Sequence, residues 1–339
     1  MQTESDKKPP KPDCVVGIGA SAGGLAAFRA LLPHLPVGSG FSYVLVQHMD
    51  PDYPSTLNQI LSKSTSLRIE MPTHDVPLLP DQLYITPSDK DCTVVGNELR
   101  FKSVDHIGPR HSVDGLFASL AESVGRSAVG IVLSGTGSDG CQGAHLIKAA
   151  EGLVLVQDPA DAQYPGMPTA IFEARLADVI APAARLGDEL RQLAEWTVGK
   201  KKVLPLIPPG ADDFDTLLQL FRRKTGFAFE QYKESTLRRR IERRMVVNKA
   251  ERLEDYIAIV EASSTEADIF LKEIQISVTG FFREEHAFEA LRTALKVIIA
   301  KKERDEALRI WVPGCATGEE AFSIATLVAE ALGSRLSRV

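Results

Sequence analysis

Three apolar runs in this chain have the composition of buried strands, and each ends in a short polar or glycine-rich loop. The runs span residues 15–18, 41–46 and 128–133. Helical periodicity of apolar residues is clear at 23–35, 112–124 and 140–150. This alternation indicates an α/β sheet covered by helices on both faces. The loops after the carboxyl ends of parallel strands face one crevice, so side chains far apart in sequence can meet there.

Each of the three loops carries one member of a possible catalytic set. Ser21 follows the first run, His48 the second and Asp139 the third. A serine hydroxyl is a poor nucleophile near neutral pH, because it needs an imidazole to take its proton and an acid to fix the imidazole tautomer. The three loops together therefore favour hydrolysis by a nucleophilic serine.

The same loops allow other interpretations. Residues 17–22 satisfy G-x-G-x-x-A, a dinucleotide-binding fingerprint, but that function requires an acid at the end of the next strand to hold the ribose. That strand closes with Gln47 and His48 instead. The first loop also fits a glycine turn that only connects strand to helix, and Asp139 fits a cap of the helix at 140–150. On these residues alone, the alternatives stay open.

Composition argues against several classes of protein. The 339 residues carry a formal net charge of −6, which does not suggest a nucleic-acid binder. No apolar run approaches the roughly 18 residues of a membrane span, and residues 1–12 are unlike a signal peptide, so we expect a cytoplasmic protein without membrane insertion. Four cysteines without a CxxC pair favour reduced thiols, and we expect no disulfide and no metal; they are Cys14, Cys92, Cys141 and Cys315.

The pattern changes after the first domain, which we place at residues 13–197. Residues 198–210 contain three lysines and three prolines, as is typical of an exposed linker. Apolar residues at helical spacing then predict a small all-α domain over 211–283. The last segment, 284–339, reads as a helix at about 284–302, a strand at 308–312 and a helix at about 320–332.

Five sequence blocks of the first domain resemble, in family order, the catalytic domain of chemotaxis protein-glutamate methylesterases (CheB type). They are residues 19–24, 46–49, 112–114, 133–140, and 157–158 with 165–168. The resemblance implies a doubly wound, mostly parallel sheet. It also implies a serine hydrolase, without cofactor, that removes methyl groups from glutamate γ-methyl esters on chemotaxis receptors. Many members of this family also deamidate glutamine.

The resemblance assigns a role to each matched residue. Ser21 is implied to be the nucleophile, His48 the general base and Asp139 the orienting acid. Backbone amides in the turn at Thr136 and Gly137 are implied to line the oxyanion site. Two positions depart from the family pattern. Ala22 stands where the family often has threonine, and Thr136 stands where the family usually has methionine.

The second half resembles chemotaxis receptor methyltransferases (CheR type). Residues 212–282 resemble their N-terminal helical domain, and 308–320 resemble their first S-adenosylmethionine motif. The residues implied to touch this cofactor are Arg283, Gly314, Thr317, Gly318 and Glu319. Because the chain ends after one strand and one helix of that Rossmann-like sheet, we expect an incomplete transferase domain. We therefore expect no methyl transfer, and S-adenosylmethionine binding only in a complete transferase.

A basic stretch in the helical domain has three interpretations. Ten basic residues between positions 211 and 250 outnumber the six acidic ones. They are typical of a solvated helix face. The family resemblance suggests docking to the acidic helices of chemotaxis receptors. Nucleic-acid binding is the weakest option, since no aromatic platform accompanies the basic residues.

The leading hypothesis is a cytoplasmic esterase, fused to an incomplete transferase, that acts on the cytoplasmic helical domain of chemotaxis receptors. One rival is a catalytically silent scaffold that only binds receptors. The other is a dinucleotide-binding oxidoreductase, which the histidine at position 48 disfavours.

Overall fold

The computed structural model describes residues 9–47, 61, 64–103, 111–198, 212–275, 282, 285–302, 306–315 and 318–333. The chain forms two compact units, residues 1–276 and 277–339. The domain bounds expected from sequence are not tested by this division and stay a prediction. None of the described helices is both long enough and apolar enough to pass through a bilayer.

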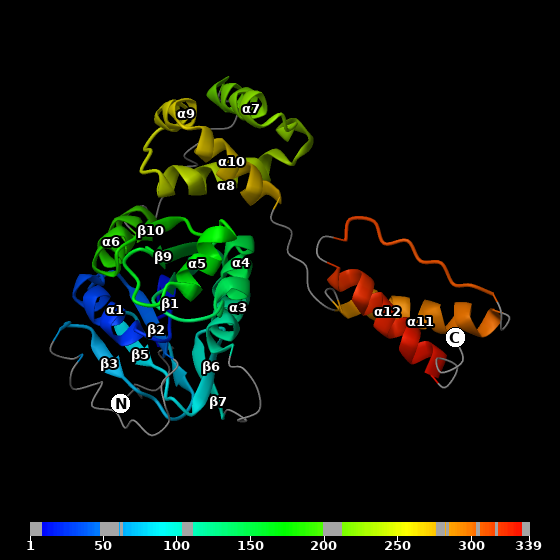
Figure 1. Ribbon diagram of the computed structural model, residues 1–339, viewed down its shortest axis with the longest axis horizontal. Helices are drawn as coiled ribbons and strands as arrows, with labels where there is room; N and C mark the ends of the chain where they lie inside the picture. Colours follow the sequence, from blue (N-terminus) through cyan, green and yellow to red (C-terminus); the bar gives the residue numbers. More distant parts are fainter. Residues whose placement is uncertain are drawn as a thin grey trace, which may run out of the picture. The chain divides into compact units, whose positions relative to one another are not determined.

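A seven-stranded parallel sheet forms the centre of the first unit, in the order β10-β9-β8-β1-β2-β5-β3 (Figure 1). Its strands are β1 (Cys14–Ala20), β2 (Phe41–Gln47), β3 (Arg68–Glu70), β5 (Gln82–Ile85), β8 (Ala128–Val132), β9 (Leu153–Gln157) and β10 (Val179–Ala181). Every residue of β1, β8 and β9 is buried, as expected for strands covered on both faces. The predicted doubly wound, mostly parallel sheet is confirmed.

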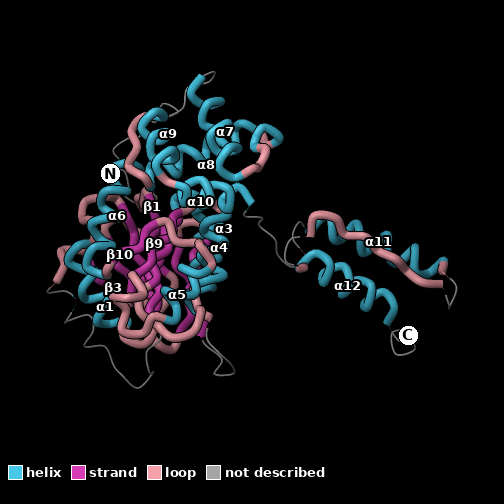
Figure 2. Tube along the Cα trace, turned by 45° about the horizontal axis from the view of Figure 1, so that its top comes forward, coloured by secondary structure: helices cyan, strands magenta, loops and turns pink. Residues whose placement is uncertain are grey.

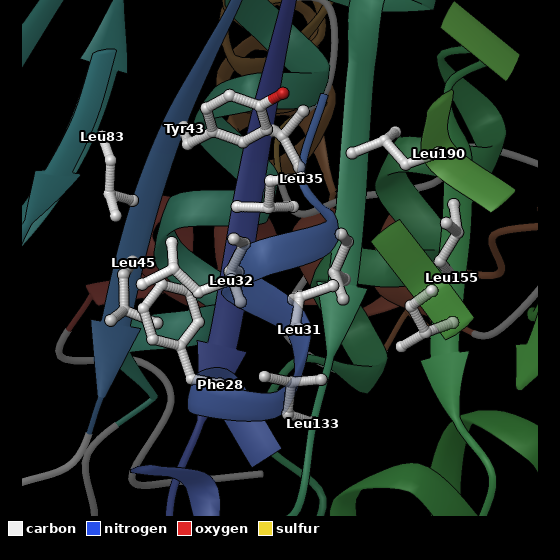
Figure 3. Close-up of a cluster of buried hydrophobic side chains, with 14 of the residues drawn as sticks. Phe28, Leu31, Leu32, Leu35, Tyr43, Leu45, Leu83, Leu133, Leu155 and Leu190 are labelled. Atoms are coloured by element: carbon white, nitrogen blue, oxygen red, sulfur yellow. The ribbon is translucent and has the colours of Figure 1, made fainter. Parts of the chain in front are cut away.

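Helices cover both faces of this sheet (Figure 2). They are α1 (Gly24–Leu31), η1 (Leu32–His34), α3 (Ser112–Val124), α4 (Cys141–Ala149), α5 (Gly166–Glu173) and α6 (Ala183–Val198). One core cluster joins α1, η1 and α6 to side chains such as Tyr43 and Leu155 (Figure 3). A second cluster joins α3, α4 and α5 to Val15 and Val132 on the other face. Alternate residues of the central strands β1 and β8 thus pack into opposite cores.

A small antiparallel sheet lies on the same side of the main sheet as α3. Its strands are β4 (Val76–Pro77), β6 (Lys90–Val95) and β7 (Glu98–Ser103), in the order β4-β7-β6. Two serines of α3 hold it: Ser119 Oγ accepts from Val94 N at 2.9 Å, and Ser123 Oγ donates to Val94 O at 2.7 Å. This separate sheet was not predicted from the sequence.

The helical domain of the first unit packs around aromatic side chains. Its elements are α7 (Asp212–Thr225), η3 (Phe229–Gln231), α8 (Glu234–Val247), α9 (Leu253–Ala262) and α10 (Ser264–Gln275). Phe221 stacks on Phe270 with ring centroids 4.2 Å apart, and Phe229 and Tyr256 complete the cluster. The predicted all-α character of this region is confirmed.

The second unit contains two described helices, α11 (Glu285–Lys301) and α12 (Glu319–Leu332). The predicted strand at 308–312 is wrong, because the structure gives these residues no strand conformation. A strand needs a neighbour to complete its hydrogen-bond ladder, and no described residue of this unit supplies one. The side chain of Trp311 is 87% exposed accordingly.

Candidate active site

The three candidate loops leave neighbouring strands at one edge of the sheet. β1 lies between β8 and β2, with Gly19 paired to Val132 and Ala20 paired to Gln47. Ser21 follows β1 directly, and Asp139 lies in the loop between β8 and α4. His48 is the next residue after β2 and lies outside the described residues. The strand order therefore places the start of each loop at the same carboxyl edge, as the sequence predicted.

The loop that carries Ser21 is a tight turn into α1. Ser21 is half-buried, and its carbonyl oxygen accepts a hydrogen bond from Gly24 N at 2.8 Å. Gly23 caps α1 with a φ of 70°, and a Cβ there would lie 2.7 Å from Ser134 Oγ. A side chain at position 23 would be strained in conformation and would also collide. Glycine at this position thus brings the turn close to the loop after β8.

Ser134 ties three loops together in the buried edge of the site. Its carbonyl oxygen accepts a hydrogen bond from Ser21 N at 3.0 Å, and its Oγ donates to Ala22 O at 2.8 Å. The same Oγ accepts from Tyr164 N at 3.0 Å, while Ser134 N donates to Gln157 Oε1 at 2.8 Å. Sequence reasoning did not assign roles to Ser134 or Gln157, although both lie in blocks that carried the family resemblance.

The turn after Ser134 lies against the Ser21 side chain. A Cβ on Gly135 would come 2.9 Å from Ser21 Cβ and 2.1 Å from Met167 Sδ, so only glycine fits without displacement. Gly135 N donates to Tyr164 O, and Met167 N donates to Gly135 O, each at 2.9 Å. Thr136 and Gly137 are exposed at the tip, and neither amide donates a hydrogen bond to another described residue.

Asp139 is buried and binds the N-terminus of α3. Its Oδ2 accepts from Val113 N at 3.0 Å, and its Oδ1 accepts from Asp114 N at 2.9 Å. The alternative interpretation of Asp139 as the cap of the helix at 140–150 is wrong, because Gly140 occupies the cap of α4. The carboxylate instead caps a helix distant in sequence, which fixes its position at the carboxyl edge.

Asp114 continues this arrangement toward α4. Its Oδ1 accepts from Gly143 N at 2.7 Å. Burial raises the pKa of Asp114, the Gly143 amide lowers it, and the charge of Asp139 raises it further. His111, Asp114 and Asp139 offer ligand atoms within 4.8 Å of one another, which is close enough for a metal ion. Both oxygens of Asp139 and one of Asp114 already accept backbone N–H groups, so we assign no metal here.

The cysteines take no part in this site. All four are free thiols in the structure. Burial raises the pKa of both Cys14 and Cys92 to about 12, so neither thiol ionises near neutral pH.

The residues expected to hold S-adenosylmethionine are only partly described. Gly314 and Gly318 have positive φ angles of 74° and 107°, and Glu319 begins α12. Arg283 and Thr317 lie outside the described residues. A strand, glycine turn and helix are required to hold such a cofactor, and the strand is not formed. The described residues therefore do not fit the cofactor, and no chemical step is derived through it.

Family comparisons divide the chain into three regions. The CheB methylesterase family matches residues 16–190. The chain belongs to the CheB methylesterase family. The CheR methyltransferase all-alpha domain matches residues 212–274, and the CheR methyltransferase SAM binding domain matches 277–338. Both resemblances recognised in the sequence are thereby confirmed, and the chain joins a methylesterase domain to a methyltransferase-like region.

Two relatives and one solved structure are similar to parts of this chain. A Rhodobacter capsulatus protein, described only as an uncharacterized 104.1 kDa protein in the hypE 3' region, is 30% identical over 80% of this chain. Protein-glutamate methylesterase/protein-glutamine glutaminase 2 of Xanthomonas oryzae pv. oryzae is 32% identical over 54% of this chain. The matches span 31% and 52% of those two relatives' own lengths. The Thermotoga maritima CheB methylesterase catalytic domain matches over 98% of its chain and 53% of this one, at 27% identity and a TM-score of 0.49.

Proposed function

We propose that this chain is a cytoplasmic protein-glutamate methylesterase that hydrolyses glutamate γ-methyl esters on the cytoplasmic helical domain of chemotaxis receptors. The observation that carries the proposal is the packing of Ser21 against the glycine turn after β8, in a chain of the CheB methylesterase family. Relatives named protein-glutamate methylesterase/protein-glutamine glutaminase support glutamine deamidation as a second reaction of the same site.

The proposed reaction proceeds through an acyl-enzyme. Ser21 Oγ attacks the ester carbonyl carbon while His48 takes the hydroxyl proton. Backbone amides of Thr136 and Gly137 donate to the oxyanion of the tetrahedral intermediate. The bond between the carbonyl carbon and the methoxy oxygen then breaks. His48 gives its proton to the methoxy oxygen, and methanol leaves. Water, deprotonated by His48, attacks the acyl-enzyme and releases glutamate with Ser21 restored.

Asp139 has a positioning role in this proposal. It holds the His48 imidazole in the tautomer that accepts the Ser21 proton. Its own carboxylate is fixed by the two amides at the start of α3. The carboxylate of Asp139 is therefore held in place before substrate binds.

Active-site labelling tests the proposal. A fluorophosphonate probe is expected to form a phosphonyl ester on Ser21, located by peptide mass spectrometry, and the full chain is expected to release methanol from methylated receptor. Ser21→Ala abolishes both. Ser138→Ala is the matched control, because Ser138 is exposed in the loop after β8 and has no proposed role. A wild-type chain that takes no label and releases no methanol would support the receptor-binding scaffold instead.

A further inference from the structure

Five charged side chains from the sheet domain and the helical domain of the first unit meet in one buried cluster. We call this the interdomain charge cluster. Its members are Lys148 in α4, Asp178 just before β10, Arg243 and Arg244 in α8, and Glu273 in α10. None of these side chains is more than 7% exposed. Buried charges persist only where partners compensate the loss of hydration, so separating the two surfaces would leave these charges without part of that compensation.

Each anion of the cluster is held by cations from both domains. Asp178 Oδ1 lies 2.5 Å from Lys148 Nζ of its own domain, and Asp178 Oδ2 lies 2.6 Å from Arg243 Nη2 of the helical domain. Glu273 Oε1 lies 2.7 Å from Lys148 Nζ across the interface and 3.4 Å from Arg244 Nη1 within its own domain. Lys148 therefore bridges the two carboxylates.

A further carboxylate balances the helical side. Glu266 of α10 pairs with Arg244 at 2.6 Å and accepts hydrogen bonds from the hydroxyl of Tyr256 at 2.7 Å and from Asn248 Nδ2 at 3.0 Å. With Glu266, three anions face the three cations of the cluster, and the buried Arg240 also donates to the carbonyl oxygen of Glu273. Burial by itself would raise the pKa of both Asp178 and Glu273, but Arg243 and Lys148 lower both values overall, so the carboxylates remain charged.

Weaker contacts surround the cluster. Lys249 pairs with Glu189 of α6 at 3.1 Å, and Arg239 pairs with Glu151 just before β9. Val246 and Val247 of α8 pack against the core cluster of the sheet domain. The interface thus combines a buried ionic centre with apolar and exposed ionic contacts around it.

The interface lies at the opposite edge of the sheet from the candidate active site. Asp178 and Glu151 precede the amino ends of their strands, and Lys148 lies in the last turn of α4, whereas Asp139 precedes the first turn of that helix. Figure 1 shows α8 and α10 beside this part of the sheet domain. The helical domain therefore contacts the edge remote from Ser21.

We propose that the arginine-bearing face of α8 is a docking surface for the sheet domain of this same chain, recognised through the Lys148–Asp178 pair, and that the two domains open as one cooperative unit. Arg243 and Arg244 are then committed to an intramolecular contact, and so are unavailable to a receptor or a nucleic acid. Exposed basic residues such as Arg223 and Lys233 are left for any external partner.

Hydrogen exchange of the full chain, followed by mass spectrometry under increasing urea, tests cooperativity directly. Peptides from α8 and α10 are expected to exchange in the same opening as peptides from β8 and β9, with the same urea dependence. Exchange of α8 and α10 in a separate opening of lower urea dependence would overturn the proposal in the wild-type chain, before any substitution is made.

A double-mutant cycle across the interface tests the ionic centre. Lys148→Met and Glu273→Gln each leave an uncompensated charge, and each is expected to speed exchange of α8 and α10 by about 100-fold or more. The double variant leaves the net charge of the cluster unchanged and is expected to lose much less than the product of the single effects. Glu254→Gln is the control, since it removes an exposed ion pair with Arg252 within the helical domain and should change nothing. If the increases in exchange rate of the two single variants simply multiply in the double variant, the two side chains are not coupled across the interface.

Discussion

The backbone N–H of Ser21 donates a hydrogen bond to the carbonyl oxygen of Ser134 at 3.0 Å, which links the loops after two neighbouring strands. The hydroxyl of Ser134 adds a second link through Ala22 O and a third through Tyr164 N. The loop that carries the proposed nucleophile is therefore held by the interior of the protein. Its conformation depends on residues that do not take part in the chemistry.

Ser134→Ala is expected to lower kcat more than it raises KM. The substitution leaves Ala22 O and Tyr164 N without their side-chain partner in a partly buried site, at a cost of about 1 kcal/mol of stability. Misplacement of Ser21 affects the attack on the ester more than substrate binding. Steady-state kinetics and urea unfolding measure the two effects. Ser134→Thr keeps the hydroxyl and should recover part of the loss, whereas an unchanged kcat in Ser134→Ala would contradict this role.

Gly135→Ala is expected to abolish ester hydrolysis. The new methyl group would lie 2.1 Å from Met167 Sδ and 2.9 Å from Ser21 Cβ, so the turn or the nucleophile must move. Gly115→Ala is the matched control, since that glycine lies in α3 with no atom within 4 Å of the added Cβ. It should retain activity and gain about 0.5–1 kcal/mol of stability from helix propensity. Full activity in Gly135→Ala would refute the close packing of the turn on Ser21.

Asp139→Asn and Asp139→Ala separate two roles of one carboxylate. Both remove the negative charge that orients the base, so both are expected to lower kcat by about 10⁴-fold. Asn keeps one oxygen for the amides of α3, whereas Ala removes both acceptors and should cost a further ~1 kcal/mol of stability. Kinetics on methylated receptor and chemical denaturation give the two quantities. Normal turnover in Asp139→Asn would show that this residue only caps α3.

The architecture of the sheet domain could be predicted because the periodicity of apolar residues within each segment indicates whether that segment is a helix or a strand. The helix predicted at 112–124 has the observed bounds of α3, and the apolar runs at 15–18 and 41–46 lie within β1 and β2. Burial on both faces requires strands that are apolar along their whole length, and such strands can be recognised from a short stretch of sequence. The strand predicted at 308–312 is wrong because its residues have strand composition but no neighbouring strand among the described residues.

Contacts between distant segments could not be predicted in the same way. The charges of Arg243 and Arg244 suggested a solvated helix face, because their partner Asp178 lies in another domain. No role could be assigned to Ser134 from the sequence, because its hydrogen bonds reach Ala22 and Tyr164, which lie far from it along the chain. A family motif identified the loops of the site, but only the fold gives the partners that hold them.

The stability of the first unit is expected to fall as the pH is lowered below about 4. The cations beside Asp178 and Glu273 depress both pKa values below their ordinary values of 3.8 and 4.5. A carboxyl group whose pKa is depressed in the folded state contributes stability at pH values above its ordinary pKa. This stability is lost as the pH falls through the folded-state pKa. Urea unfolding from pH 7 to pH 3 measures the effect. Glu273→Gln should show a weaker acid dependence, and an identical dependence would remove Glu273 from the explanation.

The second unit is expected to show no micromolar binding of S-adenosylmethionine in this chain. The segment before Gly314 forms no strand, and Trp311 and Phe322 expose 87% and 65% of their surface, so the described residues do not build a cofactor cradle. A helix N-terminus alone supplies a few amide donors but no enclosure for the adenosine. Isothermal titration calorimetry of the full chain with S-adenosylmethionine should therefore give no saturable heat. A complete receptor methyltransferase serves as the positive control, and saturable binding that Gly314→Val removes would contradict this expectation, because it would place a working cofactor site in residues 277–339.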